Sequence, residues 1–124
     1  MTPRASKSAT FERVHKLGGK LPGVALDKYF GAPALKLDGQ MLACMASHKS
    51  AESNTLVVRI EFFGRDLRVA NEPDIYYLKP HYVDYPCVLA RLSGIDDTAL
   101  SELLESGWRF IKKKKAARTG RYRS

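Results

Sequence analysis

Residues 34–46 read ALKLDGQMLACMA, and this stretch decides the predicted fold. Asp38 and Gly39 lie between two runs of alternating character, and Asp-Gly favours a two-residue type I′ turn between antiparallel strands. A turn of this length determines which residues face one another across the hairpin. The expected pairs are Leu37 with Gln40, Lys36 with Met41, and Leu35 with Leu42.

Three more segments are predicted to be strands. Residues 55–60 (TLVVRI) follow a polar loop, and residues 75–79 and 86–93 are joined by a loop that reads PHYVDY. Their β-branched and aromatic residues, bounded by turn-forming residues, are typical of strands. Residues 20–31 (KLPGVALDKYFG) are interrupted by proline and glycine and are expected to form an ordered loop. The sheet is therefore predicted to have about five strands.

Helical spacing predicts a helix from Ser8 to the Gly-Gly pair at 18–19 and a weaker one over residues 64–71. The last helix has the clearest pattern, because Asp96 or Asp97 can cap it and a single apolar stripe follows. The stripe contains Leu100, Leu103, Leu104, Gly107, Trp108 and Ile111. The order of elements predicts an α+β two-layer sandwich, with the N- and C-terminal helices on one face of an antiparallel sheet.

Length and composition predict one domain over residues 8–111, between a flexible N-terminus at 1–7 and a basic C-terminal tail at 112–124. The chain has no run of eighteen apolar residues, and its first twenty residues lack the apolar segment of a secretory signal. We therefore expect a cytoplasmic protein with no membrane segment. Cys44 and Cys87 are far from CxxC spacing and are expected to be buried or half-buried, reduced thiols, with a disulfide between them as the alternative.

The net charge of +8 is concentrated at the two ends of the chain. Residues 1–20 carry +4 and residues 112–124 carry +7, which leaves −3 for the residues between them. A run of cations without an acid is typical of a flexible arm that neutralises nucleic-acid phosphates, although a solvated tail has the same composition. The cations of the tail are Lys112, Lys113, Lys114, Lys115, Arg118, Arg121 and Arg123.

Strand alternation predicts which side chains lie on the sheet face away from the helices. If Leu35, Leu37 and Leu42 face the helices, the neighbouring residues of the hairpin face away; these are Lys36, Met41, Ala43 and Met45. The same argument turns Val57, Arg59, Cys87, Leu89 and Arg91 outward. The open face is then expected to bind nucleic acid through Lys36, Arg59 and Arg91, with no acid on these strands. One alternative is a homodimer or protein contact through Met41, Met45, Val57 and Leu89. The other is that the three cations only keep an open sheet face soluble.

The stretch at residues 76–92, YYLKPHYVDYPCVLARL, raises the possibility of an active site. A cysteine nucleophile needs a nearby base and an environment that stabilises the thiolate. Cys87 follows Pro86 at the start of a strand, and no carboxylate pair, metal-ligand spacing or phosphate-binding loop accompanies it. We interpret the stretch as scaffold and the protein as non-enzymatic; action on a small anion through His81 and Arg91 is the enzymatic alternative.

Four motifs can be compared with known families: LPGV at 21–24, the hairpin at 34–46, PHY-x-x-YP-x-VL-x-RL and the closing DDTALSELLESGW. Together they resemble the MmcQ/YjbR family of small bacterial proteins, and the resemblance spans residues 8–111. It implies a CyaY-like fold and a DNA-binding protein of the "double-wing" type. The matching motif residues are Leu21, Pro22, Gly23, Pro80, His81, Tyr82, Tyr85, Pro86 and Arg91.

The CyaY-like fold also serves frataxins, which bind iron through an acidic first helix. Here the first helix offers Glu12 against Arg13 and Lys16, with Lys20 just beyond, so its charge has the wrong sign for a cation site. We expect no metal and no cofactor. The sequence as a whole predicts a non-enzymatic DNA-binding protein.

Overall fold

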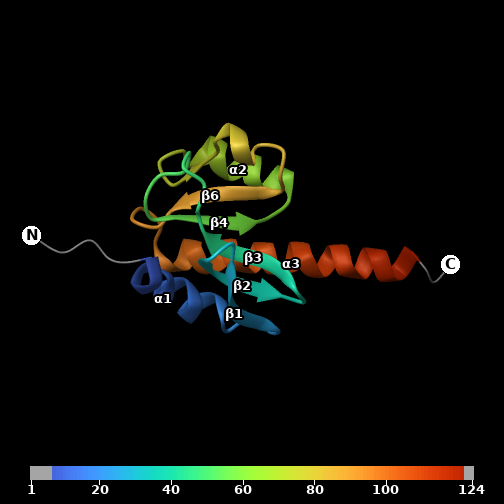
Figure 1. Cartoon of the computed structure of the whole chain (residues 1–124). Helices are drawn as coiled ribbons and strands as arrows, with labels where there is room; N and C mark the ends of the chain where they lie inside the picture. The colour runs from blue at the N-terminus through green and yellow to red at the C-terminus, as the bar shows by residue number, and fades with distance from the viewer. Residues whose placement is uncertain (1–6, 122–124) are drawn as a thin grey trace, which may run out of the picture.

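The structure of the protein is a computed structural model that describes residues 7–121. Three α-helices, six strands and one short 3₁₀ helix are found in this part of the chain (Figure 1). In chain order they are α1 (Lys7–Gly18), β1 (Val24–Tyr29), β2 (Ala32–Leu37), β3 (Gln40–Met45), β4 (Thr55–Arg59), α2 (Phe62–Asn71), β5 (Tyr76–Tyr77), η1 (Pro80–Tyr82), β6 (Cys87–Arg91) and α3 (Asp97–Arg121).

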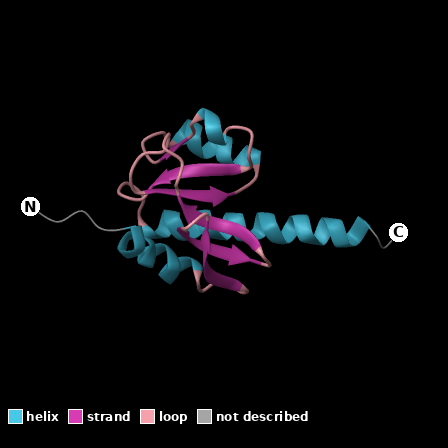
Figure 2. Cartoon of the chain, viewed as in Figure 1, coloured by secondary structure: helices cyan, strands magenta, loops and turns pink. Residues whose placement is uncertain are grey.

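The strands form an open antiparallel sheet in the order β1-β2-β3-β4-β6-β5. Helices α1 and α3 pack on one face of the sheet, whereas α2 packs against β5 and β6 (Figures 1 and 2). The predicted α+β two-layer architecture, with terminal helices on an antiparallel sheet, is therefore confirmed. Asp96 caps α3 as predicted, because its Oδ1 accepts a hydrogen bond from the Ala99 amide at 2.8 Å.

The prediction of a loop over residues 20–31 is wrong, because this segment contains the edge strand β1. Its partner strand is β2, and the two are joined by a two-residue turn at Phe30 and Gly31. Both turn residues have positive φ, 50° and 81°, as a type I′ turn requires. Phenylalanine at the first position of such a turn is unusual, so the sequence carried no recognisable turn signal. With β1 included, the described sheet has six strands rather than five.

A β-bulge interrupts the hairpin between β2 and β3. The pairs Leu37–Gln40 and Lys36–Met41 are confirmed, but Leu35 lies opposite Ala43 rather than Leu42. The extra residue reverses the alternation beyond it. Ala43 and Met45, predicted to face away from the helices, are therefore buried beneath them.

Both faces of the sheet carry apolar clusters. The larger lies between the sheet and the helices α1 and α3. It includes fully buried side chains from β2 and β3, from β4 and β6, and from the stripe of α3. The smaller cluster lies on the opposite face and comprises Ala34, Cys44, Val57, Tyr77, Tyr82, Cys87 and Leu89.

Helix α3 approaches the sheet closely at Gly107. A β-carbon at this position would lie 2.5 Å from the carbonyl oxygen of Arg59 and 2.8 Å from Cδ1 of Leu42. Glycine lets the helix backbone touch the backbone of β4. The Trp108 indole, one residue on, donates a hydrogen bond of 2.8 Å to the carbonyl of Pro22. The two contacts fix the position at which α3 crosses the sheet.

Replacing Gly107 with alanine should destabilise the protein by about 1–3 kcal/mol, because the added methyl group meets backbone that cannot move aside locally. Gly64→Ala in α2 is the matched control. There the nearest atom is the mobile guanidinium of Arg68 at 3.3 Å, and alanine favours a helix by about 0.5–1 kcal/mol. Urea unfolding measures both changes. Equal effects of the two substitutions would contradict the close approach at Gly107.

Candidate functional site: a pocket on the second sheet face and a basic helix

The second face of the sheet is covered in part by the segment between β5 and β6. Tyr82 of η1 is only 8% exposed and packs into the smaller apolar cluster. The buried Arg65 of α2 holds this segment, because its Nη1 donates to the carbonyls of Val83 at 2.8 Å and Tyr85 at 3.2 Å. The Arg65 guanidinium also lies 4.7 Å from the centre of the Phe62 ring. Arg65 is thus a positioning residue, and the sequence pattern did not single it out.

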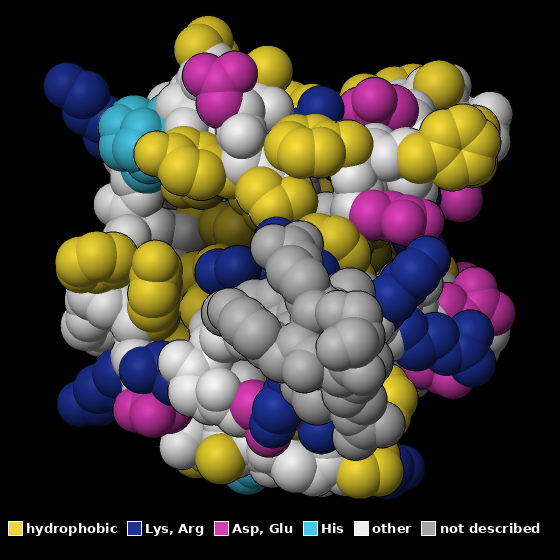
Figure 3. Space-filling view, turned by 90° about the vertical axis from the view of Figure 1, so that its right-hand side faces the viewer, with side chains coloured by type: hydrophobic (Ala, Val, Ile, Leu, Met, Phe, Trp, Pro, Cys, Tyr) yellow, Lys and Arg dark blue, Asp and Glu magenta, His cyan; other side chains and the backbone are white. Residues whose placement is uncertain are grey.

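The uncovered part of this face is a pocket of about 460 Å³. Figure 3 views the molecule from the end at which α3 projects, and it shows hydrophobic side chains around a recess. Tyr29 at the end of β1, Phe30 of the β1–β2 turn, His48 and His81 are among the residues that line it. The other lining residues are Met41, Cys44, Ala46, Ser47, Val57, Arg59, Tyr82, Tyr85, Pro86 and Cys87. None of these residues is acidic.

Arg59 is the cation of the pocket lining. Its Nε donates a hydrogen bond of 3.0 Å to the carbonyl of Met41. Among the residues that the structure describes, no carboxylate lies within ion-pair distance of Arg59, and no group accepts from its Nη1 or Nη2. A partly buried guanidinium with two donor nitrogens available is suited to bind an anion. The prediction that Arg59 lies on the face away from the helices is confirmed.

The imidazole rings of His48 and His81 are stacked, with centroids 3.7 Å apart and planes 9° from parallel. The Ser50 amide donates to Nδ1 of His48 at 3.1 Å, so the neutral His48 ring carries its hydrogen on Nε2. Burial lowers the pKa of His48, and the nearby charges of His81 and Lys49 lower it further. The pair therefore presents a flat aromatic surface, and the lowered pKa of His48 favours the neutral form of that ring.

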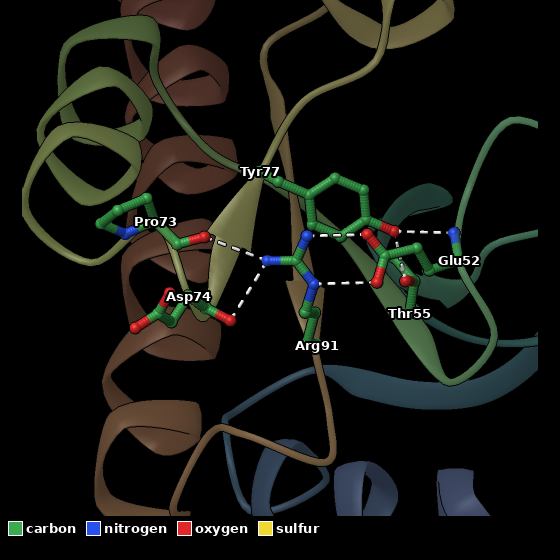
Figure 4. A network of polar contacts seen from close by, with 6 residues as sticks. All are labelled: Glu52, Thr55, Pro73, Asp74, Tyr77 and Arg91. Atoms are coloured by element: carbon green, nitrogen blue, oxygen red, sulfur yellow. Dashed lines mark hydrogen bonds and ion pairs between the residues drawn. The ribbon is translucent and has the colours of Figure 1, made fainter.

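Arg91, predicted to be free for nucleic acid, is held by protein groups (Figure 4). Its guanidinium makes two bonds to the Glu52 carboxylate, at 2.9 and 2.7 Å, and donates to the carbonyls of Pro73 and Asp74. It also stacks at 4.2 Å on the ring of Tyr77. The expectation that Arg91 is a free cation is therefore wrong. It considered acids on the strands only, whereas Glu52 lies in the loop before β4.

Lys36 also has a carboxylate partner, because its Nζ lies 3.6 Å from Oδ2 of Asp27 on the unpredicted strand β1. The Lys28 amide lowers the pKa of Asp27 by a hydrogen bond, and the charge of Lys36 lowers it further. Of the three sheet cations predicted to bind nucleic acid, only Arg59 has no carboxylate partner among the described residues. Of the basic sheet face predicted from the sequence, one cation thus remains without a carboxylate partner among the described residues, and it lies inside a pocket.

Helix α3 continues ten residues past Ile111, the last fully buried side chain among those of α3 that the structure describes. Residues 112–121 are thus helical, where the composition had indicated a flexible arm, and Arg123 lies outside the described residues. Nζ of Lys112 and of Lys115 lie 3.0 and 3.5 Å from Oδ2 of Asp38 in the β2–β3 turn. The hydrogen bond from Lys112 lowers the pKa of Asp38. Lys113 and Lys114 are exposed.

A groove of about 350 Å³ between α2 and α3 brings three more cations together. Arg68, Arg109 and Lys113 line it, with Glu61 as its acidic group. Figure 3 shows lysine and arginine side chains gathered at this end of the molecule. We call Lys112–Lys115 and these groove cations the basic end. Arg68 and Arg109 were not among the predicted binding residues, because sequence spacing does not bring α2 beside α3.

Several residues of the motifs described in the sequence analysis make contacts that support the fold. Leu21 packs against the larger core, and Gly23 has a φ of 80°, which favours glycine. Pro80 begins η1, and the carbonyl of Pro86 accepts from the Ile60 amide at 2.9 Å. His81 and Tyr85 differ from these residues because both are exposed at the pocket.

Cys44 and Cys87 are free thiols, buried as predicted. Burial raises the pKa of Cys44 to about 12 and that of Cys87 to about 11. Neither group is therefore a thiolate near neutral pH, and a nucleophilic role has no support from this environment. Within residues 7–121 no cluster of three metal-ligating side chains is found, and no helix has the length and apolar character needed to cross a bilayer.

Comparison with known proteins gives short matches only. No family model and no solved structure matches the chain. Uncharacterised proteins of Mycobacterium bovis and of two strains of Mycobacterium tuberculosis are 42% identical to it over 40 residues. The match covers 32% of this chain and 31% of each relative. The assignment of function therefore depends on the geometry of the site.

Arg91→Ala should destabilise the protein by about 1–3 kcal/mol at pH 7, the range for lost hydrogen bonds to a charged group. The hydrogen bond from Arg91 lowers the pKa of Glu52 below its ordinary 4.5. The stabilisation from the pair is therefore present above pH 4.5 and is lost as the pH falls through the lowered pKa. Urea unfolding of both proteins across this range should show the difference between them narrowing in acid.

The matched control is Arg109→Ala, which removes an exposed pair with Glu105 on α3. Its effect should stay within about 0.5 kcal/mol. If the Arg91→Ala difference were as large near pH 3 as at pH 7, the Glu52 pair would not contribute to stability.

Both cysteines should resist alkylation in the folded protein at pH 8. With a pKa of about 11, only about one Cys87 in a thousand is a thiolate at that pH, and Cys44 is lower still. Iodoacetamide labelling followed by mass spectrometry should find both thiols unmodified without denaturant and both modified in urea. Rapid labelling of either residue in the folded protein would contradict the burial described above.

Proposed function

We propose that the protein is a non-enzymatic nucleic-acid-binding protein that contacts phosphates through its basic end. The observation that carries the proposal is the projection of α3 beyond its packed part. The helix carries no acid after Glu105, and its sequence from there includes Arg109, Lys112–Lys115, Arg118 and Arg121; Arg123 follows in the sequence outside the described residues. Cations on a projecting helix bind phosphates and release counterions.

The shape of the basic end supports this proposal. Lys112 is anchored to Asp38, and a pair of exposed lysines follows it on the same helix. The groove beside them adds Arg68 and Arg109, so the cations belong to two helices whose spacing is fixed by packing. Phosphate contacts of this kind position a protein on DNA without reading its sequence. The resemblance to the MmcQ/YjbR family agrees with a DNA-binding role.

The alternative is a homodimer through the open sheet face. Most of the residues predicted to form that interface are buried within a single chain. Met45 is 1% exposed beneath the helices, and Leu89 is 0% exposed beneath the segment that contains Tyr82. Val57 is 4% exposed. These side chains are already buried within one chain, so they leave little apolar area for a second copy.

The test is a titration of fluorescein-labelled 12-bp duplex DNA against the full chain, followed by anisotropy at several salt concentrations. Lys113→Ala combined with Lys114→Ala should reduce the slope of log K against log salt by about 1.8, since each lost phosphate contact contributes about 0.9. Lys16→Ala combined with Lys28→Ala removes the same charge from exposed positions on α1 and β1.

The control pair should leave most of the slope intact. If the unmodified protein binds neither this duplex nor a single strand of the same length at low salt, the proposed function is wrong. If both double variants reduce the slope equally, the binding surface is not the basic end.

A further inference from the structure

The turn at Phe30 and Gly31 contains an unfavourable residue in a strained position. Phe30 has a φ of 50°, in the left-handed region that bulky residues rarely adopt, and it is 85% exposed. The second hairpin of the chain has the same backbone at Asp38 and Gly39, with φ values of 52° and 79°, and uses the residues that favour it. Strain of this kind is found where a side chain serves a ligand.

The described contacts of Phe30 with the rest of the chain offer little stabilisation to offset this strain. Its described ring contact is an edge-on one with Tyr29, at 4.7 Å between centroids. Phe30 instead lines the pocket on the second sheet face, and the stacked pair of His48 and His81 lines the same pocket. Flat aromatic groups therefore line this recess, and its volume of about 460 Å³ lies within the range of small-ligand sites.

Arg59 adds an anion-binding group to this aromatic site. Two of its nitrogens are available to a ligand, and the pocket lining contains no acid to compete for them. An aromatic wall next to a guanidinium suits a flat ring with an attached phosphate. A nucleotide has this chemistry.

The pocket and the basic end approach the same part of the fold. Arg59 bonds to Met41, one residue into β3 from the β2–β3 turn, and Lys112 pairs with Asp38 in that turn. The Arg59 carbonyl also lies against Gly107, from which α3 runs outward to its lysines. A strand whose phosphates contact α3 can therefore reach the pocket with an unpaired base.

We propose that this pocket binds one unpaired base of a single-stranded nucleic acid, with the base against Phe30 and its phosphate at Arg59. The inference rests on the proposed function and adds the class of ligand, a single strand in preference to a duplex. A paired base cannot enter, because its edge and both faces are already occupied in the duplex.

The experiment compares a fluorescein-labelled dT 12-mer with the 12-bp duplex, using anisotropy at low salt. Phe30→Ala should weaken binding of the single strand about 5- to 100-fold, as loss of one base–aromatic stack does, and leave duplex binding unchanged. Phe63→Ala, an equally large exposed aromatic residue on α2 outside the pocket lining, is the matched control and should change neither. Arg59→Ala should lower the salt slope for the single strand by about 0.7.

Phe30→Asn provides a second readout that a merely structural role would not produce. Asparagine favours a type I′ turn, so this variant should melt at the same or a higher temperature while it binds the single strand more weakly. A variant with lower stability and unchanged binding would show that Phe30 serves the fold alone.

The outcomes separate the two proposals. Absence of binding to both nucleic acids refutes the proposed function. Duplex binding together with single-strand binding that does not depend on Phe30 refutes only the pocket as a base-binding site. Free thymidine monophosphate is the other source of the same chemistry; if it competed with the 12-mer at equal molar concentration, a free nucleotide would replace the strand as the ligand.

Discussion

The sheet of this protein is apolar on both faces, and each face must be shielded from water. Helices α1 and α3 cover one face, and the core between them and the sheet includes fully buried side chains from β2, β3, β4 and β6. The second face is covered in part by the segment between β5 and β6, whose Tyr82 packs in one apolar cluster with Val57 and Leu89. This partial cover leaves an apolar recess, and the candidate ligand site is the uncovered remainder of the face.

The same arrangement gives the three cations of the second face different partners. Arg91 lies at the covered end, where Glu52, two carbonyls and the ring of Tyr77 occupy its guanidinium. Lys36 is paired with Asp27 at the opposite edge. Arg59 lies between them in the recess, where the described chain supplies one carbonyl and no carboxylate. A cation without a carboxylate partner in an aromatic pocket is available to an anionic ligand.

Helix α3 links the core to the basic end. Its apolar stripe ends at Ile111, and the contact of Gly107 with β4 sets the direction in which the rest of the helix leaves the body. Because the helix is continuous, Lys113 and Lys114 are carried at defined positions beside the groove that contains Arg68 and Arg109. A disordered tail of the same composition would supply the charge without this placement.

The sequence by itself determined the elements with strong local signals: the Asp38-Gly39 hairpin, the capped apolar stripe of α3 and the outward direction of Arg59. It could not determine β1, because Phe30 is not a residue that predicts a turn, or the bulge at Leu42, which reversed the expected directions of Ala43 and Met45. Tertiary structure alone decided that Glu52 neutralises Arg91, that Arg65 holds the pocket wall, and that Phe30 and Arg59 line one recess. Local propensity acts between neighbours in the chain, whereas these contacts join residues that only the packing of the sheet brings together.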